Sequence, residues 1–225
     1  MSQTYAIGDL HGCLDQLKQL VELCERDAGE GRSKFVFLGD YIDRGPDSRG
    51  VVEFLMDLQR WSPDEIICLR GNHEDLLLAA LEGEDAELVW RQNGAQFTLA
   101  SYKAKTPRDI PITHLDWLRS LPVFHDDGIR FFVHAGVHPD RPLHLQRRRD
   151  LLWIREPFLS SDKDFGRLIV HGHTPLSSGI PDQRSNRLNI DTGAVYGRAL
   201  TSAIFCRCTR HPTKFISASP SGSAS

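Results

Sequence analysis

The chain of 225 residues carries 27 basic and 30 acidic side chains, a formal charge of −3, with 40% hydrophobic and 25% charged residues. This composition excludes the disordered, collagen-like and membrane-embedded classes, and it argues against a strongly basic nucleic-acid binder. We expect one domain over 1–216, because an α/β chain of this length buries a full core without disulfides. The Ser-rich tail at 217–225 is expected to be disordered.

Short apolar runs alternate with helical periodicity over the first half of the chain. Strands are predicted at 5–7, 35–38 and 66–69, and each is followed by apolar residues at helical spacing, within 14–24, 51–58 and 74–81. This β-α-β-α-β-α order predicts a parallel sheet with right-handed crossovers.

The second half has a different pattern. The segment 82–122 is predicted to be mostly helical, and strands predominate beyond it, at 129–133, 168–170, 188–190 and 200–206. An α/β half followed by a strand-rich half predicts two packed sheets with helices outside them, within one domain.

The N-terminal segment and the cysteines indicate the compartment. The first residues, MSQTYAIGDL, contain no basic segment followed by an apolar one, so we expect no secretory signal. The longest aliphatic run, from Leu76 to Leu81, is too short to span a membrane. Five cysteines without framework spacing are typical of reduced thiols. We therefore expect a cytoplasmic protein with no membrane or nucleic-acid partner.

Polar clusters follow five of the predicted strands. GDLHG, GDYIDRG and GNHE occupy 8–12, 39–45 and 71–74, and HAG and HGHT occupy 134–136 and 171–174. Because ligands bind beyond the carboxyl ends of the strands in open α/β sheets, we expect these clusters to meet in one crevice.

The side chains in these clusters indicate a metal site. Asp, His and Asn without Cys suit Mn, Fe, Zn or Mg, and six candidates with a carboxylate able to bridge suggest two ions. Asp9 and His11 alternate on an extended segment, which points both to one side. Arg44 adds a guanidinium that binds a tetrahedral oxyanion with two hydrogen bonds. The residues thus predict metal-assisted phosphoester hydrolysis.

These five motifs, in this order, resemble the signature of the phosphoprotein phosphatase family, especially its small bacterial and bacteriophage lambda-type serine/threonine members. They extend from Gly8 to Tyr196 and so cover most of the chain. The resemblance implies an α/β (α+β) fold, the calcineurin-like metallophosphoesterase fold, with a central two-sheet β-sandwich flanked by helices. It also implies two divalent ions, manganese first and Fe, Zn or Mg as others, and a phosphoprotein or phosphopeptide substrate.

The resemblance also implies roles for individual residues. Asp40 matches a carboxylate that bridges the two ions, whose full set of ligands is Asp9, His11, Asp40, Asn72, His134 and His173. His73 matches the catalytic histidine that protonates the leaving alkoxide, and Asp43 the carboxylate that orients it. The phosphate-binding arginines match Arg44 and, on the shorter motif Trp-Ile-Arg, Arg155. His171 stands where relatives have an apolar residue and is left outside the ligand set.

Several clusters have simpler interpretations. Asp9 is also a common type of helix cap, although the other clusters make that interpretation minor. The run Arg147–Arg149 is interpreted as a solvated face. Cys206 and Cys208 lack the second pair that a zinc site needs.

Three functions compete. The favoured one is a serine/threonine or dual-specificity protein phosphatase. The alternative is a hydrolase of dinucleoside polyphosphates such as diadenosine tetraphosphate. Those enzymes share the metal motifs but depart at the position of Asp43 and end the third motif in Asp, where this chain has Glu74. The third is a catalytically silent binding module, against which the complete ligand set argues.

Overall fold

The first half of the chain builds a parallel sheet, as its alternating pattern predicts. The computed structural model describes residues 3–220. In it three strands pair in parallel, β1 (Gln3–Ile7), β2 (Ser33–Phe37) and β3 (Ile66–Cys68). Two later strands extend this sheet in antiparallel fashion beside β1, in the order β10-β9-β1-β2-β3: β9 (Leu200–Cys206) and β10 (Lys214–Ala218).

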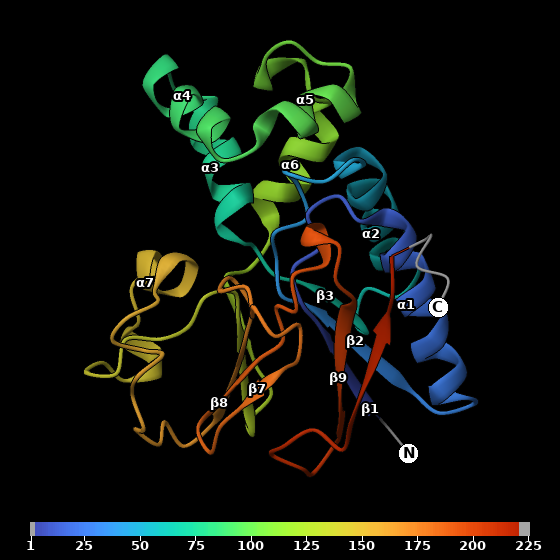
Figure 1. Cartoon of the computed structure of the whole chain (residues 1–225), viewed down its shortest axis with the longest axis vertical. Coiled ribbons are helices and arrows are strands. Elements are labelled where there is room, and N and C mark those ends of the chain that lie inside the picture. The colour runs from blue at the N-terminus through green and yellow to red at the C-terminus, as the bar shows by residue number, and fades with distance from the viewer. Residues whose placement is uncertain (1–2, 221–225) are drawn as a thin grey trace.

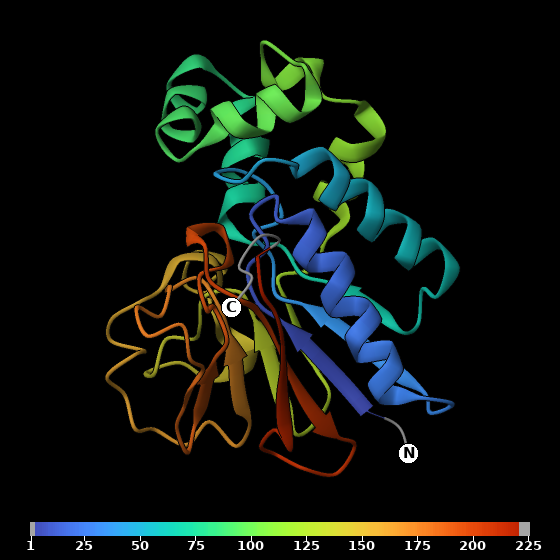
Figure 2. The ribbon, with the colours of Figure 1, turned by 45° about the vertical axis from the view of Figure 1, so that its right-hand side comes forward.

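A second sheet comes from the later part of the chain and has the order β4-β5-β6-β8-β7. Its parallel centre consists of β5 (Arg130–Val133), β6 (Leu168–His171) and β8 (Arg187–Asn189). Its antiparallel edges are β4 (Phe124–Asp126) and β7 (Asp182–Gln183). Figure 2 shows the two sheets face to face, so the predicted two-sheet fold flanked by helices is confirmed.

Alternation along the strands separates two apolar layers. Ala6 and Val36 face the second sheet, where they pack with Phe132. Tyr5 and Phe37, which point to the other side, pack against two helices: α1 (Leu14–Ala28) and α2 (Ser48–Trp61). The first sheet is therefore buried on both faces, as its nearly continuous apolar strands require.

The predicted helical middle rises above the carboxyl ends of the strands (Figure 1). It comprises α3 (Asn72–Ala80), α4 (Glu84–Gln92), α5 (Ala95–Tyr102), the short η1 (Pro107–Asp109) and α6 (Ile112–Ser120). Three further short helices lie between strands: η2 (Leu143–Leu145), α7 (Arg148–Trp153) and η3 (Ala194–Tyr196).

The expectation that residues 217–225 are disordered is wrong at its start. Ser217 and Ala218 belong to β10, where they pair with Thr201 and Leu200, and Ala218 is buried against the helical layer. Composition misleads here because an edge strand is held by backbone hydrogen bonds that small polar residues also make. Residues 221–225 lie outside the described part of the chain.

The apolar pattern of the sequence does not predict three strands, β4, β7 and β10, because each is short or mostly exposed. Within residues 3–220, no helix combines the length and the apolar character that a membrane span needs. All five cysteines are free thiols.

Candidate metal centre and active site

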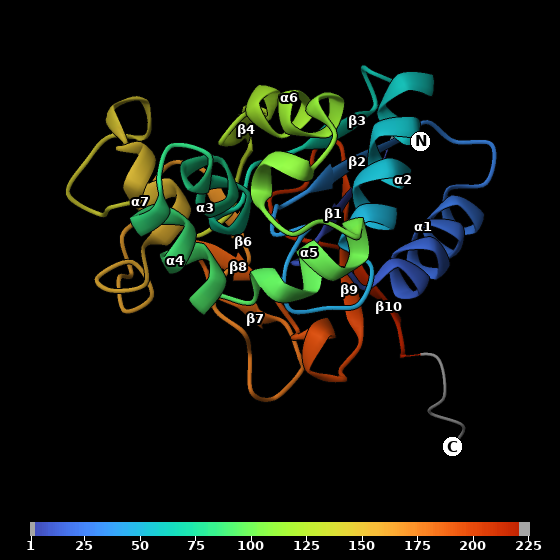
Figure 3. The same ribbon diagram turned by 90° about the horizontal axis from the view of Figure 1, so that it is seen from above.

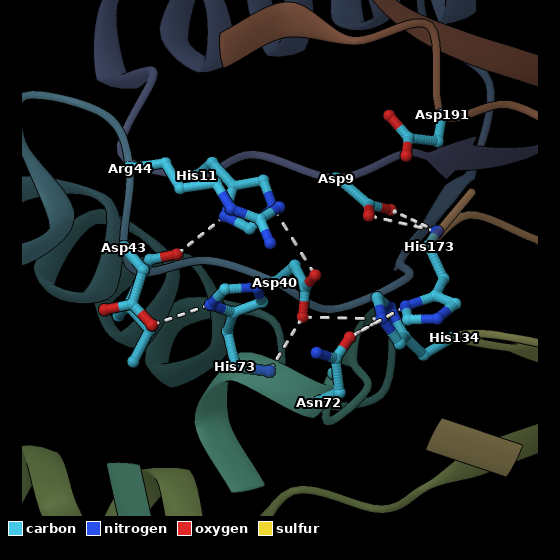
Figure 4. Close-up of polar contacts among 12 residues, drawn as sticks. Asp9, His11, Asp40, Asp43, Arg44, Asn72, His73, His134, His173 and Asp191 are labelled. Atoms are coloured by element: carbon cyan, nitrogen blue, oxygen red, sulfur yellow. Dashed lines mark hydrogen bonds and ion pairs between the residues drawn. The ribbon is translucent and has the colours of Figure 1, made fainter. Parts of the chain in front are cut away.

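The five polar clusters meet at one place, beyond the ends of both sheets (Figure 4). The loop after β1 supplies Asp9 and His11, and the loop after β2 supplies Asp40, Asp43 and Arg44. The remaining members come from the first turn of α3 and from the ends of β5 and β6: Asn72, His73, His134 and His173. The structure thus brings together all six predicted ligands and the predicted catalytic pair, and each of these eight side chains is buried.

The loops that carry these residues are strained. Within residues 3–220, six residues other than glycine have a positive φ, and five of them belong to the site: His11, Asp40, Asp43, Arg44 and His173. Each such residue costs on the order of 1–3 kcal/mol, and such strain concentrates at functional sites. The glycines let the loops approach one another closely, since a Cβ on Gly172 would lie 2.0 Å from Oδ1 of Asp9.

Main-chain carbonyls fix two of the histidines with one ring nitrogen facing the centre. Nδ1 of His11 donates to the carbonyl of Ile42 at 2.8 Å, and Nδ1 of His134 donates to that of Leu38 at 3.0 Å. Each Nε2 then carries a lone pair directed inward, the arrangement typical of histidine metal ligands. Burial lowers the pKa of His11 and of His173 to about 3, so both rings are neutral and able to bind a cation.

Potential ligand atoms of Asn72, His134 and His173 lie within hydrogen-bond distance of one another in this centre. Oδ1 of Asn72 lies 2.7 Å from Nε2 of His134 and 2.8 Å from Nδ1 of His173. Nearby, burial and the charges of Asp191 and Asp40 raise the pKa of Asp9 well above its ordinary value. Lone pairs and carboxylates gathered in this way fit divalent metal ions.

Asp40 occupies the middle of the cluster. It is shared by two groups of potential metal-binding side chains, one with His11 and His73 and one with His134 and His173, whose ligand atoms lie within 4.8 Å of one another. Its two carboxylate oxygens are each 3.4 Å from a histidine nitrogen, Oδ2 from Nε2 of His11 and Oδ1 from Nε2 of His134. Asp40 is thus the one carboxylate that both of these groups share.

His73 and Asp43 form a buried pair beside the cluster. Nδ1 of His73 donates to Oδ2 of Asp43 at 2.7 Å, while its Nε2 has no hydrogen-bond partner among residues 3–220. Burial by itself lowers the pKa of His73, but the charges of Asp40 and Asp43 outweigh it and raise the pKa above its ordinary value. His73 is therefore suited to hold a proton on the nitrogen that is free.

A cavity of about 650 Å³ opens directly over the cluster and is lined by Asp40, Asn72, His73 and His173. Its rim carries three arginines from separate segments, Arg44, Arg149 and Arg155. Nη1 of Arg44 donates to Nε2 of His11 at 2.9 Å. The interpretation of the run 147–149 as a solvated face holds only in part. Arg148 pairs with Asp75 at 2.7 Å, outside the cavity, whereas Arg149 lines it.

Comparison with known proteins places this geometry in a family. The family model described as calcineurin-like phosphoesterase matches residues 3–198. The chain belongs to the calcineurin-like phosphoesterases.

Relatives of this phosphoesterase carry two kinds of name. A symmetrical bis(5'-nucleosyl)-tetraphosphatase of Nitrosospira multiformis is 38% identical over 135 residues, 60% of this chain but only 44% of that relative. A serine/threonine-protein phosphatase 1 of Salmonella typhimurium is 31% identical and is matched over 88% of this chain and 90% of its own. An asymmetrical bis(5'-nucleosyl)-tetraphosphatase of Anoxybacillus flavithermus is 29% identical over 87% of both chains.

A solved structure shares the fold of this phosphoesterase over nearly its whole length. The crystal structure of a putative diadenosine tetraphosphatase superposes with a TM-score of 0.72, covering 98% of this chain and 94% of that chain at 24% identity. At 24% identity, this similarity shows a shared fold and nothing about activity.

Several residues at the site of the phosphoesterase were not predicted from the sequence. Asp191, buried beside Asp9, follows the predicted strand at 188–190, so the same strand-end rule points to it. Trp90 and Thr98 come from α4 and α5, and both donate to the carboxylate of Asp43, Nε1 of Trp90 at 2.9 Å and Oγ1 of Thr98 at 2.6 Å. No strand-end motif marks these two positions.

Glu74 has a supporting role in the phosphoesterase fold. Its carboxylate accepts from the backbone nitrogens of Gly71 at 2.8 Å, Asp40 at 2.9 Å and Tyr41 at 2.7 Å. It thereby caps the first turn of α3 and joins that turn to the Asp40 loop. Glu74 is buried and does not line the cavity, so it makes a poor indicator of which substrate enters.

The Trp90 contact gives a stability prediction. Trp90→Phe keeps the buried ring but removes one donor from the Asp43 carboxylate, and hydrogen bonds to charged groups contribute about 1.5–3 kcal/mol. We expect the free energy of unfolding, measured with urea, to fall by about that amount. Trp117→Phe is the matched control, because its indole donates to the neutral amide of Gln59 in a half-buried position; it is expected to lose about 0.5–1.5 kcal/mol. Equal losses would contradict this role of Trp90.

Proposed function

We propose that this phosphoesterase hydrolyses phosphoanhydride bonds of dinucleoside polyphosphates. The observation that carries the proposal is the group of three arginines at the cavity, whose lining also includes Asp150, paired with Arg141, and Glu156. Arg44, Arg149 and Arg155 line it from three segments, and neither Arg149 nor Arg155 forms an ion pair with any residue in 3–220. Three arginines exceed what one terminal phosphate needs, whereas a polyphosphate presents several charged groups in a row. The tetraphosphatases among the relatives support this choice over the protein phosphatase that the motifs suggested.

In this proposal the six predicted ligands bind two divalent ions. Such ions supply Lewis-acid activation of water and neutralise charge on the phosphoryl group. Manganese is the first expectation for their identity. The donor set of Asp, His and Asn fits the ions, as the converging lone pairs of the cluster indicate.

The chain's own residues have defined tasks in the reaction. Arg44 and Arg155 bind the non-bridging oxygens of the phosphoryl group that is attacked. A water molecule releases one proton to solvent as its oxygen forms a bond to phosphorus, the bridging P–O bond breaks, and Nε2 of His73 gives its proton to the leaving oxygen. Asp43 keeps the His73 ring in place and stabilises its charge, with a contact of 2.7 Å.

A second candidate is a protein phosphatase acting on phosphoserine or phosphothreonine. The His73–Asp43 pair favours it, because an alkoxide leaving group is strongly basic and needs a proton more than a phosphate does. The Salmonella phosphatase, matched over 90% of its length, supports it as well. Both candidates use the same centre and differ in what occupies the cavity.

Product analysis tests the proposed function. The metal-free chain is loaded with Mn²⁺ and incubated with diadenosine tetraphosphate, and nucleotides are separated by anion-exchange chromatography. We expect release of adenine mononucleotides, loss of that activity with EDTA and its recovery when Mn²⁺ is restored. Intact substrate after incubation with the metal-loaded protein would contradict the proposal.

A further inference from the structure

An exposed tryptophan stands at the wall of the catalytic cavity. Trp153 is the last residue of α7 and is 38% exposed, while the two residues before it, Leu151 and Leu152, are buried. Its ring lies 6.1 Å from that of His173, nearly perpendicular to it. Trp153 therefore presents an aromatic surface to the cavity at the edge of the metal centre. This exposed part of the ring is not packed in the apolar core.

Two other side chains border the same space. Arg149 lies one helical turn before Trp153, so the two share a face of α7. Tyr196 reaches the cavity from η3; it is 54% exposed, and its hydroxyl has no hydrogen-bond partner within residues 3–220. Figure 3 shows α7 and the turn at 194–196 apart from each other, with α4 between them in that view. The cavity thus has an aromatic side chain on two of its walls.

We propose that Trp153, Arg149 and Tyr196 form a nucleotide subsite, in which Trp153 stacks on a nucleobase and Arg149 binds a phosphate beyond the one attacked. The inference rests on the proposed function and specifies how that site selects its substrate. Aromatic rings stack on any base, and a guanidinium on the same helix face meets the adjoining phosphate. A cavity of about 650 Å³ lies within the range of small-molecule sites, about 300–1,000 Å³. Tyr196 offers a second aromatic surface to the other end of a dinucleotide.

Calorimetric titration of the Mn²⁺-loaded protein with ADP and with inorganic pyrophosphate, in excess free Mn²⁺, tests the subsite. The two ligands share their phosphates and differ in the nucleoside. Trp153→Leu, which keeps apolar bulk without an aromatic face, is expected to weaken ADP binding about 5- to 150-fold, from the stacking energy per base. Pyrophosphate binding should change less than about twofold. Arg149→Ala is expected to weaken both ligands.

Trp61→Leu is the matched control, since Trp61 is 84% exposed and remote from the cavity, and it should change neither affinity. Equal losses for ADP and pyrophosphate in Trp153→Leu would overturn the subsite, because Trp153 would then act through His173. Unchanged ADP binding would overturn it too. Nucleotide release from diadenosine tetraphosphate by the unmodified protein tests the proposed function separately. If the unmodified protein acts only on phosphopeptides and Trp153→Leu still loses affinity for ADP alone, the proposed function is refuted and the subsite is supported.

Discussion

Replacing His73 with asparagine is expected to lower kcat by about 10²–10⁴-fold, the usual contribution of a general acid, without releasing bound metal. His73 donates through Nδ1 to Asp43 and leaves Nε2 buried without a partner in the described chain. Burial lowers the pKa of His73, but the charges of Asp40 and Asp43 outweigh it and raise that pKa, which favours a proton on this nitrogen. Steady-state kinetics together with metal analysis of the variant measure both expectations.

The size of this loss should depend on the leaving group. A serine alkoxide takes up a proton far more readily than a phosphate does, so His73→Asn is expected to impair hydrolysis of a phosphoserine peptide more than that of a dinucleoside polyphosphate. His144→Asn is the matched control, because His144 is exposed and lies on η2, outside the cavity. Unchanged turnover of His73→Asn on both substrates would refute the assignment of His73.

Replacing Asp40 with asparagine is expected to remove most of the bound metal and the activity that depends on it. Asp40 is shared by both groups of candidate ligands, and its oxygens lie 3.4 Å from Nε2 of His11 and of His134. Loss of a residue that only orients a ligand lowers metal affinity about 10–100-fold, so loss of the shared carboxylate should exceed about 100-fold. Mass spectrometry of the metal content after dialysis gives the measurement.

Folding and metal binding can be separated in this variant. The metal-free centre gathers three buried carboxylates, and burial together with the charges of Asp191 and Asp40 raises the pKa of Asp9. Burial alone would also raise the pKa of Asp40, but the charges of His134, His73 and His11 outweigh it and hold that pKa below its ordinary value. In EDTA, Asp40→Asn should therefore unfold at a lower temperature than the unmodified protein, because it loses a buried charge with favourable partners, while still unfolding in one cooperative transition. Asp57→Asn, an exposed change on α2, controls for the substitution itself and should retain the metal. Full metal content and activity in Asp40→Asn would contradict the bridging role.

The sequence allows the centre to be predicted because its residues follow apolar strands directly. Asp9, Asp40 and His134 each stand a few residues beyond a strand of strong apolar pattern, and parallel strands end at the same edge. Trp90 and Thr98 lack such a cue, since helix packing alone brings them to Asp43. The edge strands β4, β7 and β10 are missed because backbone pairing, rather than apolar side chains, determines them.

Substrate preference is harder to infer from motifs than the metal centre is. Asp43 and Glu74 suggested a protein phosphatase, yet Glu74 contacts only backbone nitrogens and does not line the cavity. Some of the side chains that line the cavity, among them Arg149 and Trp153, lie on α7, outside the strand-end motifs. Their positions depend on how α7 packs against the second sheet, which a local pattern does not encode.

We propose that the cavity over the metal centre is built for polyphosphates and not for phosphopeptides. The most direct measurement is the ratio of kcat/KM for diadenosine tetraphosphate to that for a phosphoserine peptide, with the same Mn²⁺-loaded protein at neutral pH. We expect the dinucleotide to be preferred by at least about tenfold, equivalent to about 1.4 kcal/mol in transition-state binding. A preference for the peptide would contradict it.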